Sequence, residues 1–169
     1  MKWFWRILGG LALVLVAAFF VLRVPDTDAG AMYAKYGTPP SQMLGIDRTR
    51  RVHVRDEGPR DAPVVILLHG SNADLHTWQA WADALKSDYR VIRFDQRGHG
   101  LTGPAADGDY ALDAFVEDID EVAAALDIGR FTLAGNSMGG AIAIGYAIAN
   151  PERLEGLVLV DAGGAPIES

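Results

Sequence analysis

The chain has 169 residues, a formal net charge of −7 and no cysteine. Without cysteine it contains no disulfide, thiolate nucleophile or cysteine-ligated metal. The acidic balance argues against nucleic-acid binding, which needs clustered lysine and arginine.

Residues 1–24 predict a transmembrane signal anchor. Lys2 and Arg6 precede an unbroken apolar run over residues 7–22, which approaches the roughly 20 residues that span a bilayer as a helix. A cleaved signal peptide is the alternative, with the small residues 29–31 as its cleavage site. That site lies far beyond the apolar run, so an uncleaved anchor is favoured. The basic residues favour a cytoplasmic N-terminus, which places the remaining chain on the extracytoplasmic, periplasmic side.

Residues 25–41 form a predicted linker that is rich in glycine and proline and has room for one short helical turn. Residues 42–46 and 51–58 then predict an antiparallel hairpin. Val52 and Val54 alternate with His53 and Arg55, a pattern typical of one buried and one wet face. His53 is therefore expected at the surface or its boundary. A basic stretch in the connecting turn, formed by Arg48, Arg50 and Arg51, is interpreted as a solvated edge.

From residue 64 onward, strand and helix patterns alternate. A continuous apolar run typical of a strand buried on both faces occupies residues 64–68. Further strands are predicted at residues 89–95, 131–136 and 154–162. Helical patterns occupy residues 73–87, 111–127 and 138–150; the first aligns Trp78 and Trp81 on one apolar face. Residues 42–169 are therefore predicted to form an α/β domain with a mainly parallel sheet.

The turns that leave these strands carry the polar and glycine-rich stretches of the domain. Their sequences are HGSN at 69–72, DQRGHG at 95–100, GNSMGG at 135–140 and DAGG at 161–164. In an open parallel sheet, ligands bind beyond the carboxyl ends of the strands. All these turns are expected to open on one edge of the sheet.

Ser137 is the candidate nucleophile in the GNSMGG turn. A serine at a sharp strand-to-helix turn is forced toward positive φ, and its neighbours two before and two after, Gly135 and Gly139, must be small. The Met138 N–H would be one oxyanion donor, and the second is expected from Ser71 in the loop after strand 64–68. The alternative is a plain helix N-cap.

Over residues 52–161 the chain resembles the α/β-hydrolase superfamily, specifically its alpha/beta-hydrolase-1 type members. The resemblance depends on G-x-S-x-G, on His69-Gly70 after an apolar strand, and on FDQRGHG at residues 94–100 between them. It implies a nucleophilic Ser137 and oxyanion donors that match Ser71 and Met138.

The same resemblance implies that His69 has a structural role in shaping the oxyanion loop, and that His99 belongs to loop architecture. A triad in this fold runs serine, acid, histidine in chain order, yet no histidine follows Ser137. Asp161 is a candidate acid, with hydrogen bonding to nearby turns as its alternative role. The expectation is that the chain is the N-terminal part of a longer enzyme and that residues 1–169 alone are inactive.

The resulting hypothesis is a membrane-anchored serine hydrolase that acts on small esters or related acyl compounds through an acyl-enzyme on Ser137. No cofactor is expected, and no histidine pair has zinc spacing, so no metal is expected. A different class stays open, namely an inert fragment or a non-catalytic binding domain. Within the fold, acyltransferase, haloperoxidase and carbon–carbon hydrolase activities also stay open.

Overall fold

A computed structural model describes residues 2–24 and 26–164 of the chain, which divides into two compact units, Met1–Ala31 and Met32–Ser169. The first unit contains helix α1 (Lys2–Leu22), which has a mean hydropathy of 2.3 and no buried residue. By length and composition α1 can cross a membrane, and a signal sequence near an N-terminus has the same properties. Helix α2 (Ala29–Tyr36) is longer than the single turn expected in the linker.

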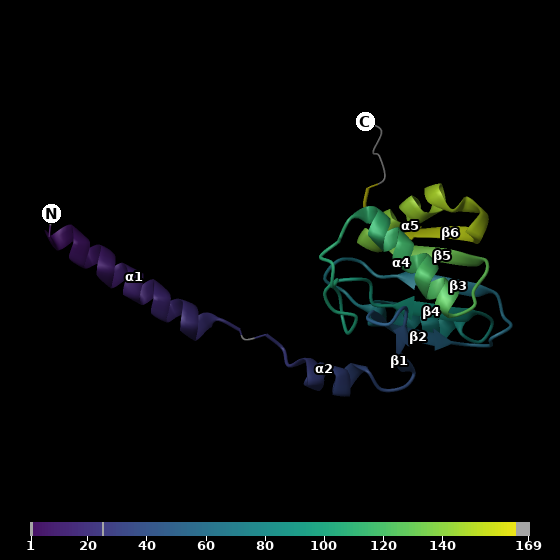
Figure 1. Ribbon diagram of the computed structural model, residues 1–169, viewed down its shortest axis with the longest axis horizontal. Coiled ribbons are helices and arrows are strands. Elements are labelled where there is room, and N and C mark those ends of the chain that lie inside the picture. The colour runs from purple at the N-terminus through teal and green to yellow at the C-terminus, as the bar shows by residue number, and fades with distance from the viewer. Residues whose placement is uncertain (1, 25, 165–169) are drawn as a thin grey trace. The chain divides into compact units, whose positions relative to one another are not determined.

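The unit Met32–Ser169 is built on a six-stranded sheet with the order β1-β2-β4-β3-β5-β6 (Figure 1). Its strands are β1 (Ser41–Gly45), β2 (Arg51–Glu57), β3 (Val64–Leu68), β4 (Arg90–Phe94), β5 (Phe131–Asn136) and β6 (Leu154–Val160). The pairs β1·β2 and β2·β4 are antiparallel, whereas β4·β3, β3·β5 and β5·β6 are parallel. The predicted hairpin and the mainly parallel α/β sheet are confirmed.

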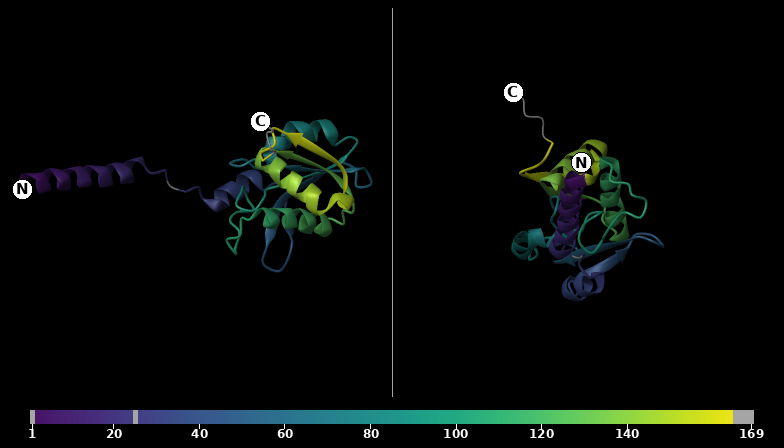
Figure 2. Two further views of the ribbon diagram at one scale, coloured as in Figure 1. Left: turned by 90° about the horizontal axis from the view of Figure 1, so that it is seen from above. Right: turned by 90° about the vertical axis from the view of Figure 1, so that its left-hand side faces the viewer.

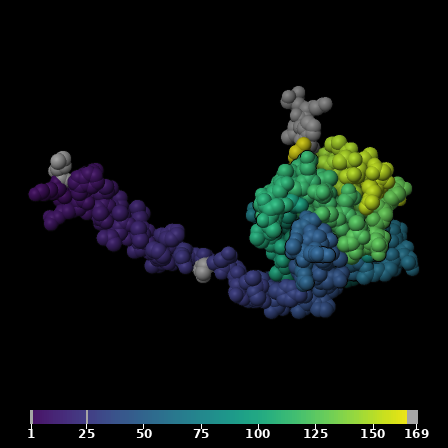
Figure 3. All heavy atoms as spheres, in the orientation of Figure 1, coloured from purple at the N-terminus to yellow at the C-terminus, as the bar shows by residue number. Residues whose placement is uncertain are grey.

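Helices cover both faces of this sheet (Figure 2). One face carries the 3₁₀ helix η1 (Leu75–Trp78) and α3 (Gln79–Leu85); the other carries α4 (Leu112–Ala125) and α5 (Met138–Ala149), and the 3₁₀ turn η2 (Pro151–Arg153) leads into β6. In the space-filling view, residues of α4 and α5, coloured green to yellow-green, form part of the visible surface of this unit (Figure 3).

The apolar runs of the central strands supply both sides of the core, because successive strand residues point to opposite faces. On β3, Ile66 and Leu68 pack in the cluster that includes α4 and α5, and Val65 and Leu67 pack with Trp78 of η1. A strand buried on both faces has no polar positions, which explains the continuous run.

The predicted wet face of the hairpin is wrong for β2. His53 is only 1% exposed, and Arg55 is partly buried and donates hydrogen bonds to Ser41 and Gln79. The reason is that β2 is paired on both sides and η1 and α3 cover this face. Trp81 is also misassigned, since it is 43% exposed.

The basic turn is only partly a solvated edge. Arg48 and Arg51 are exposed, but Arg50 is partly buried and pairs with Asp118 and Glu121 of α4. Sequence position alone does not reveal these partners, because they lie about 70 residues away along the chain.

Candidate functional site

Ser137 joins β5 to α5 in a strained backbone conformation, with φ 52° and ψ −116°. A non-glycine residue in such a region costs of order 1–3 kcal/mol. Its carbonyl accepts the N–H groups of Gly140, Ala141 and Gly163 at 2.9–3.1 Å, and its own N–H donates to Val160 at 3.2 Å. The predicted positive φ at this turn is confirmed.

The glycines around Ser137 are required by close backbone contacts. A Cβ atom on Gly135 would lie 2.2 Å from the Gly139 carbonyl oxygen, and one on Gly139 would lie 2.4 Å from the Leu68 carbonyl oxygen. A Cβ atom on Gly140 would lie 2.5 Å from the Ala162 side chain. The prediction that Gly135 and Gly139 must be small is confirmed, and Gly140 adds a contact with the loop after β6.

Ser137 occupies the N-cap position of α5, but its side chain makes no capping hydrogen bond. A serine selected for capping would bond to an N–H group in the first turn of the helix. The hydroxyl is therefore not used for that purpose. Met138 is the first residue of α5, so its N–H belongs to the unsatisfied, partly positive end of the helix.

The loop that carries Ser71 lies against this turn. His69 and Gly70 follow β3 and are both buried, whereas Ser71 is exposed. A Cβ atom on Gly70 would lie 3.1 Å from the Ser137 Cβ atom and from Asn136 Oδ1. The structure thus brings the Gly70 end of the Ser71 loop into direct contact with the Ser137 turn.

The loop after β6 meets the turn from the other side. Asp161 is exposed and has a φ of 46°. Two residues later, Gly163 donates its N–H to the Ser137 carbonyl. Asn136, which the sequence reading did not single out, donates from Nδ2 to the Val160 carbonyl at 3.0 Å and so ties β5 to β6. The signal for Asn136 was a polar residue at the end of an apolar strand.

A buried pair, His53 and Asp95, lies where β2 and β4 meet the same sheet edge. The His53 Nδ1 atom is 2.7 Å from Asp95 Oδ2, and the backbone N–H groups of Leu75 and Leu101 donate to the same carboxylate at 2.8 Å. Burial opposes ionisation, yet these hydrogen bonds hold the pKa of Asp95 below its ordinary value. Asp95 therefore organises the loops after β3 and β4.

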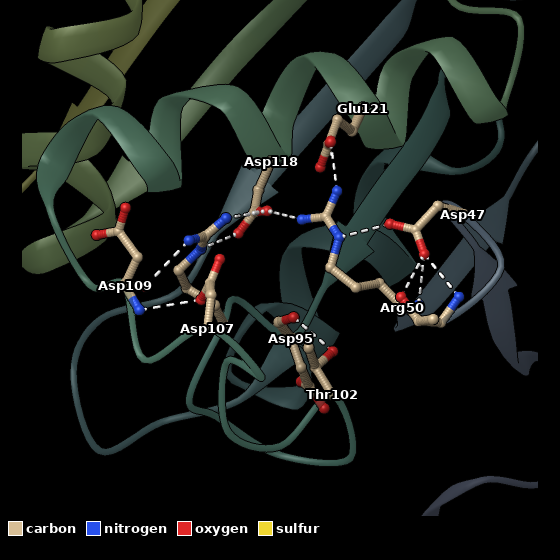
Figure 4. Close-up of polar contacts among 10 residues, drawn as sticks. Asp47, Arg50, Asp95, Thr102, Asp107, Asp109, Asp118 and Glu121 are labelled. Carbon is tan, nitrogen blue, oxygen red and sulfur yellow. Dashed lines mark hydrogen bonds and ion pairs between the residues drawn. The ribbon is translucent and has the colours of Figure 1, made fainter.

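Asp118 on α4 holds a second polar cluster beside a cavity of about 320 Å³. Arg97 donates to both carboxylate oxygens at 2.6 Å, and Arg50 lies among Asp47, Asp118 and Glu121 (Figure 4). A smaller cavity of about 140 Å³ adjoins His53 and Asp95. Ser137 lines neither of these two cavities.

Within residues 2–24 and 26–164, no group of three or more histidine, cysteine, aspartate or glutamate side chains is placed to hold a metal ion. The polar clusters around Asp95 and Asp118 instead consist of ion pairs and hydrogen bonds within the described residues.

Residues 63–168 match the family model of the alpha/beta hydrolase fold. The putative carbamate hydrolase RutD of Rhizobium rhizogenes is 33% identical over 102 residues, which cover 60% of this chain and 39% of that protein. Epoxide hydrolase 4 of Mus musculus is 33% identical over 116 residues, which cover 68% of this chain and 32% of that protein.

Among solved structures, a membrane phospholipase A described as a bacterial virulence factor is similar over 100% of this chain and 55% of its own length, with 30% identity and a TM-score of 0.72. The chain thus spans less than half of the two curated relatives and about half of this structure. The matched region contains β3, β4, β5 and β6 and therefore the loops that meet at Ser137. The chain belongs to the alpha/beta hydrolase fold family.

Proposed function

We propose that this chain carries the nucleophile and the oxyanion donors of a membrane-anchored serine hydrolase that cleaves esters or related acyl compounds. The observation that carries the proposal is the strained, glycine-packed conformation of Ser137, whose hydroxyl makes no capping hydrogen bond. Strain of this kind persists where the surrounding structure over-determines it, and such positions cluster at active sites.

The proposed chemistry is acyl transfer to the Ser137 hydroxyl. Attack on the acyl carbon would convert its carbonyl oxygen into an oxyanion, which the N–H groups of Met138 and Ser71 would stabilise. Collapse of this intermediate would break the bond to the leaving alcohol, which takes up a proton, and water would then hydrolyse the acyl-enzyme to release the acid and restore the Ser137 hydroxyl. The hydroxyl needs a general base to accept its proton. Asp161 remains the candidate acid of the triad, because it follows β6 in the loop that contacts the turn.

The membrane part of the proposal depends on α1. Its length and hydropathy suit a transmembrane helix, and the membrane phospholipase A that is similar over the whole chain supports this placement. Cleavage of a phospholipid acyl ester would be one reaction of the proposed class. Because relatives of this chain include an epoxide hydrolase and a putative carbamate hydrolase, hydrolysis of epoxides and of carbamates are alternative activities, and an assay must compare them with ester hydrolysis.

A fluorophosphonate probe tests the nucleophile directly in the longest form of the protein that its gene encodes. We expect labelling of Ser137, and loss of both labelling and p-nitrophenyl ester hydrolysis in Ser137→Ala. Ser87→Ala is the matched control, because Ser87 is exposed and precedes β4 at the opposite sheet edge. Hydrolysis that survives Ser137→Ala, or a preference for epoxides over esters, would contradict the proposal.

A further inference from the structure

The side chain of His53 uses one ring nitrogen and leaves the other without a partner. Its Nδ1 atom lies 2.7 Å from Asp95 Oδ2. Against the effect of burial, hydrogen bonds hold the pKa of Asp95 below its ordinary value, so the carboxylate is ionised and can only accept. Nδ1 therefore carries the proton, and the neutral ring has a lone pair on Nε2. Within the described residues no group donates to Nε2, although the side chain is only 1% exposed. Because buried polar atoms are nearly always hydrogen-bonded, this acceptor requires an explanation.

The pair of His53 and Asp95 lies too far from Ser137 to act on its hydroxyl. His53 is on β2 and Ser137 follows β5, and the strand order places β4 and β3 between them. Since neighbouring strands lie about 4.8 Å apart, three spacings separate β2 from β5 by roughly 14 Å. The unpartnered nitrogen therefore belongs to a different part of the sheet edge.

His53 and Asp95 line the smaller of the two cavities, which has a volume of about 140 Å³. This is roughly the volume of four or five water molecules in the liquid. The other lining residues come from α2, from η1 and its N-cap, and from the loop after β4: Met32, Tyr36, Asp74, His76, Gly100 and Leu101. Among these described residues two are aspartates and none is a lysine or an arginine. The walls therefore carry negative charge with no lysine or arginine to balance it.

The polar side chains of this lining present mainly hydrogen-bond acceptors. The Nδ1 atom of His76 lies 3.0 Å from Asp74 Oδ1, so Nδ1 carries the proton and the neutral ring accepts at Nε2, as in His53. The backbone N–H of His76 donates to the same Oδ1 atom, and Asp74 Oδ2 can accept from a ligand. The ring centroids of His53 and His76 are 6.2 Å apart, so one small molecule can contact both. A ligand of this cavity must therefore supply donors.

We propose that this cavity binds a small primary ammonium ion, whose N–H groups donate to His53 Nε2, to His76 Nε2 and to the Asp74 carboxylate. An ammonium group has three donors and no acceptor, and its positive charge suits walls that carry two carboxylates. A neutral alcohol has one donor only, and a carboxylate anion has none. The ammonium of Lys35 does not take this place, because its Nζ atom lies over the Tyr36 ring, 4.8 Å from the centroid, and Lys35 is not a lining residue. The site is separate from Ser137 and does not depend on the proposed hydrolase activity.

A two-bond ¹H–¹⁵N correlation spectrum of the detergent-solubilised chain at pH 8, titrated with ethylammonium chloride, observes the acceptor directly. We expect the His53 Nε2 resonance to start unprotonated and to move upfield, with a dissociation constant of about 1 mM for so small a ligand. The Nε2 atom of His69 is the internal control, because it already accepts the Gln96 N–H and should not move. Ethanol and sodium acetate at the same concentrations should have little effect. A protonated His53 Nε2 in the free chain, no response to ethylammonium, or an equal response to ethanol or acetate would overturn the proposal.

Asp74→Asn tests the charge of the site and keeps the turn that carries it. Asparagine is as good an N-cap as aspartate, and its side-chain oxygen can still accept the His76 N–H. We expect the affinity for ethylammonium to fall about 10-fold, because a charge-assisted hydrogen bond is replaced by a neutral one. Asp83→Asn, which removes an exposed carboxylate of α3 outside the cavity, should leave the affinity unchanged. Equal affinities in the two variants would contradict the proposal. If Asp74→Asn did not fold, the shift of His53 Nε2 in the unmodified chain would still decide it.

Discussion

Replacing Ser137 by glycine is expected to make the chain more stable than replacing it by alanine. Ser137 combines φ 52° with ψ −116°, which lies outside the left-handed helical region that other side chains occasionally adopt. The Cβ atom of serine or alanine is strained in this conformation, whereas glycine, which has no Cβ, is not. Both variants lose the hydroxyl, so their difference isolates the backbone term.

The expected magnitude follows from two opposing contributions. Relief of the strain contributes about 1–3 kcal/mol. The greater freedom of glycine in the unfolded chain removes about 0.4–1 kcal/mol. The net gain of Ser137→Gly over Ser137→Ala is then about 1 kcal/mol, which shifts a urea midpoint by about 0.5 M when the m-value is about 2 kcal/mol/M.

Urea unfolding of the detergent-solubilised chain, followed by far-ultraviolet circular dichroism, measures this difference. Ala147 provides a matched control in α5, where the same exchange of alanine for glycine should cost about 1 kcal/mol. The sign of the effect should therefore reverse between the two sites. An Ala variant at Ser137 as stable as the Gly variant would refute the argument that strain is stored there.

Other outcomes follow from the same structure. Gly139→Ala should lower stability by about 3 kcal/mol and abolish probe labelling, since its Cβ would meet the Leu68 carbonyl oxygen at 2.4 Å; wild-type labelling would contradict this. Asp118→Asn should lower the free energy of unfolding, measured in urea, by of order 3 kcal/mol, because it removes the partner of Arg97, whose side chain is only 8% exposed. The exposed control Asp83→Asn should change it little. If Asp118→Asn changed stability as little as Asp83→Asn, the pair with Arg97 would not be a stabilising buried pair. Burial lowers the pKa of His69 from its ordinary 6.5, so as the pH falls the unfolded chain takes up a proton that the folded chain resists. The free energy of unfolding should therefore fall between about pH 7.5 and about pH 5.5. The same decrease should be smaller in His69→Asn, which has no imidazole to protonate. A high-salt wash should leave the protein in the membrane and deletion of residues 1–24 should release it, whereas a mature N-terminus near Met32, found by mass spectrometry, would show cleavage. The 169-residue chain itself should show no ester turnover, because no histidine follows Ser137 in it; turnover that Ser137→Ala removes would point to an upstream histidine as base.

The sequence predicted the parts of the fold that depend on local pattern. The alternation of apolar runs and helical stripes identified the mainly parallel sheet, and the spacing of Gly135 and Gly139 identified the positive φ at Ser137. Both signals lie within a few residues of the feature they predict. The pair of His53 and Asp95 left no such signal, because the partners are 42 positions apart and meet only when β2 pairs with β4.

Trp81 shows a different limit. The apolar spacing over residues 73–87 assumed one α-helix with 3.6 residues per turn. The segment instead begins as the 3₁₀ helix η1 and becomes α-helical only at Gln79. A 3₁₀ helix has about 3.0 residues per turn, so Leu75 and Trp78 lie one above the other and both face the core. Trp81 follows three residues later in α-helical geometry, about 60° around the helix from Trp78, and lies at the exposed edge of the apolar face.

The strain at Ser137 persists because three parallel strands fix both ends of the turn. Leu68 of β3 pairs with Gly135, and Asn136 pairs with Val160 of β6, so the backbone directions before the turn are set by its neighbours. After the turn, Gly139 lies so close to the Leu68 carbonyl that a Cβ atom there would be 2.4 Å from the carbonyl oxygen. Relieving the φ of Ser137 would therefore disturb the sheet register or the packing of α5 against β3. The same contacts bring the loops after β3 and β6 against one residue, Ser137.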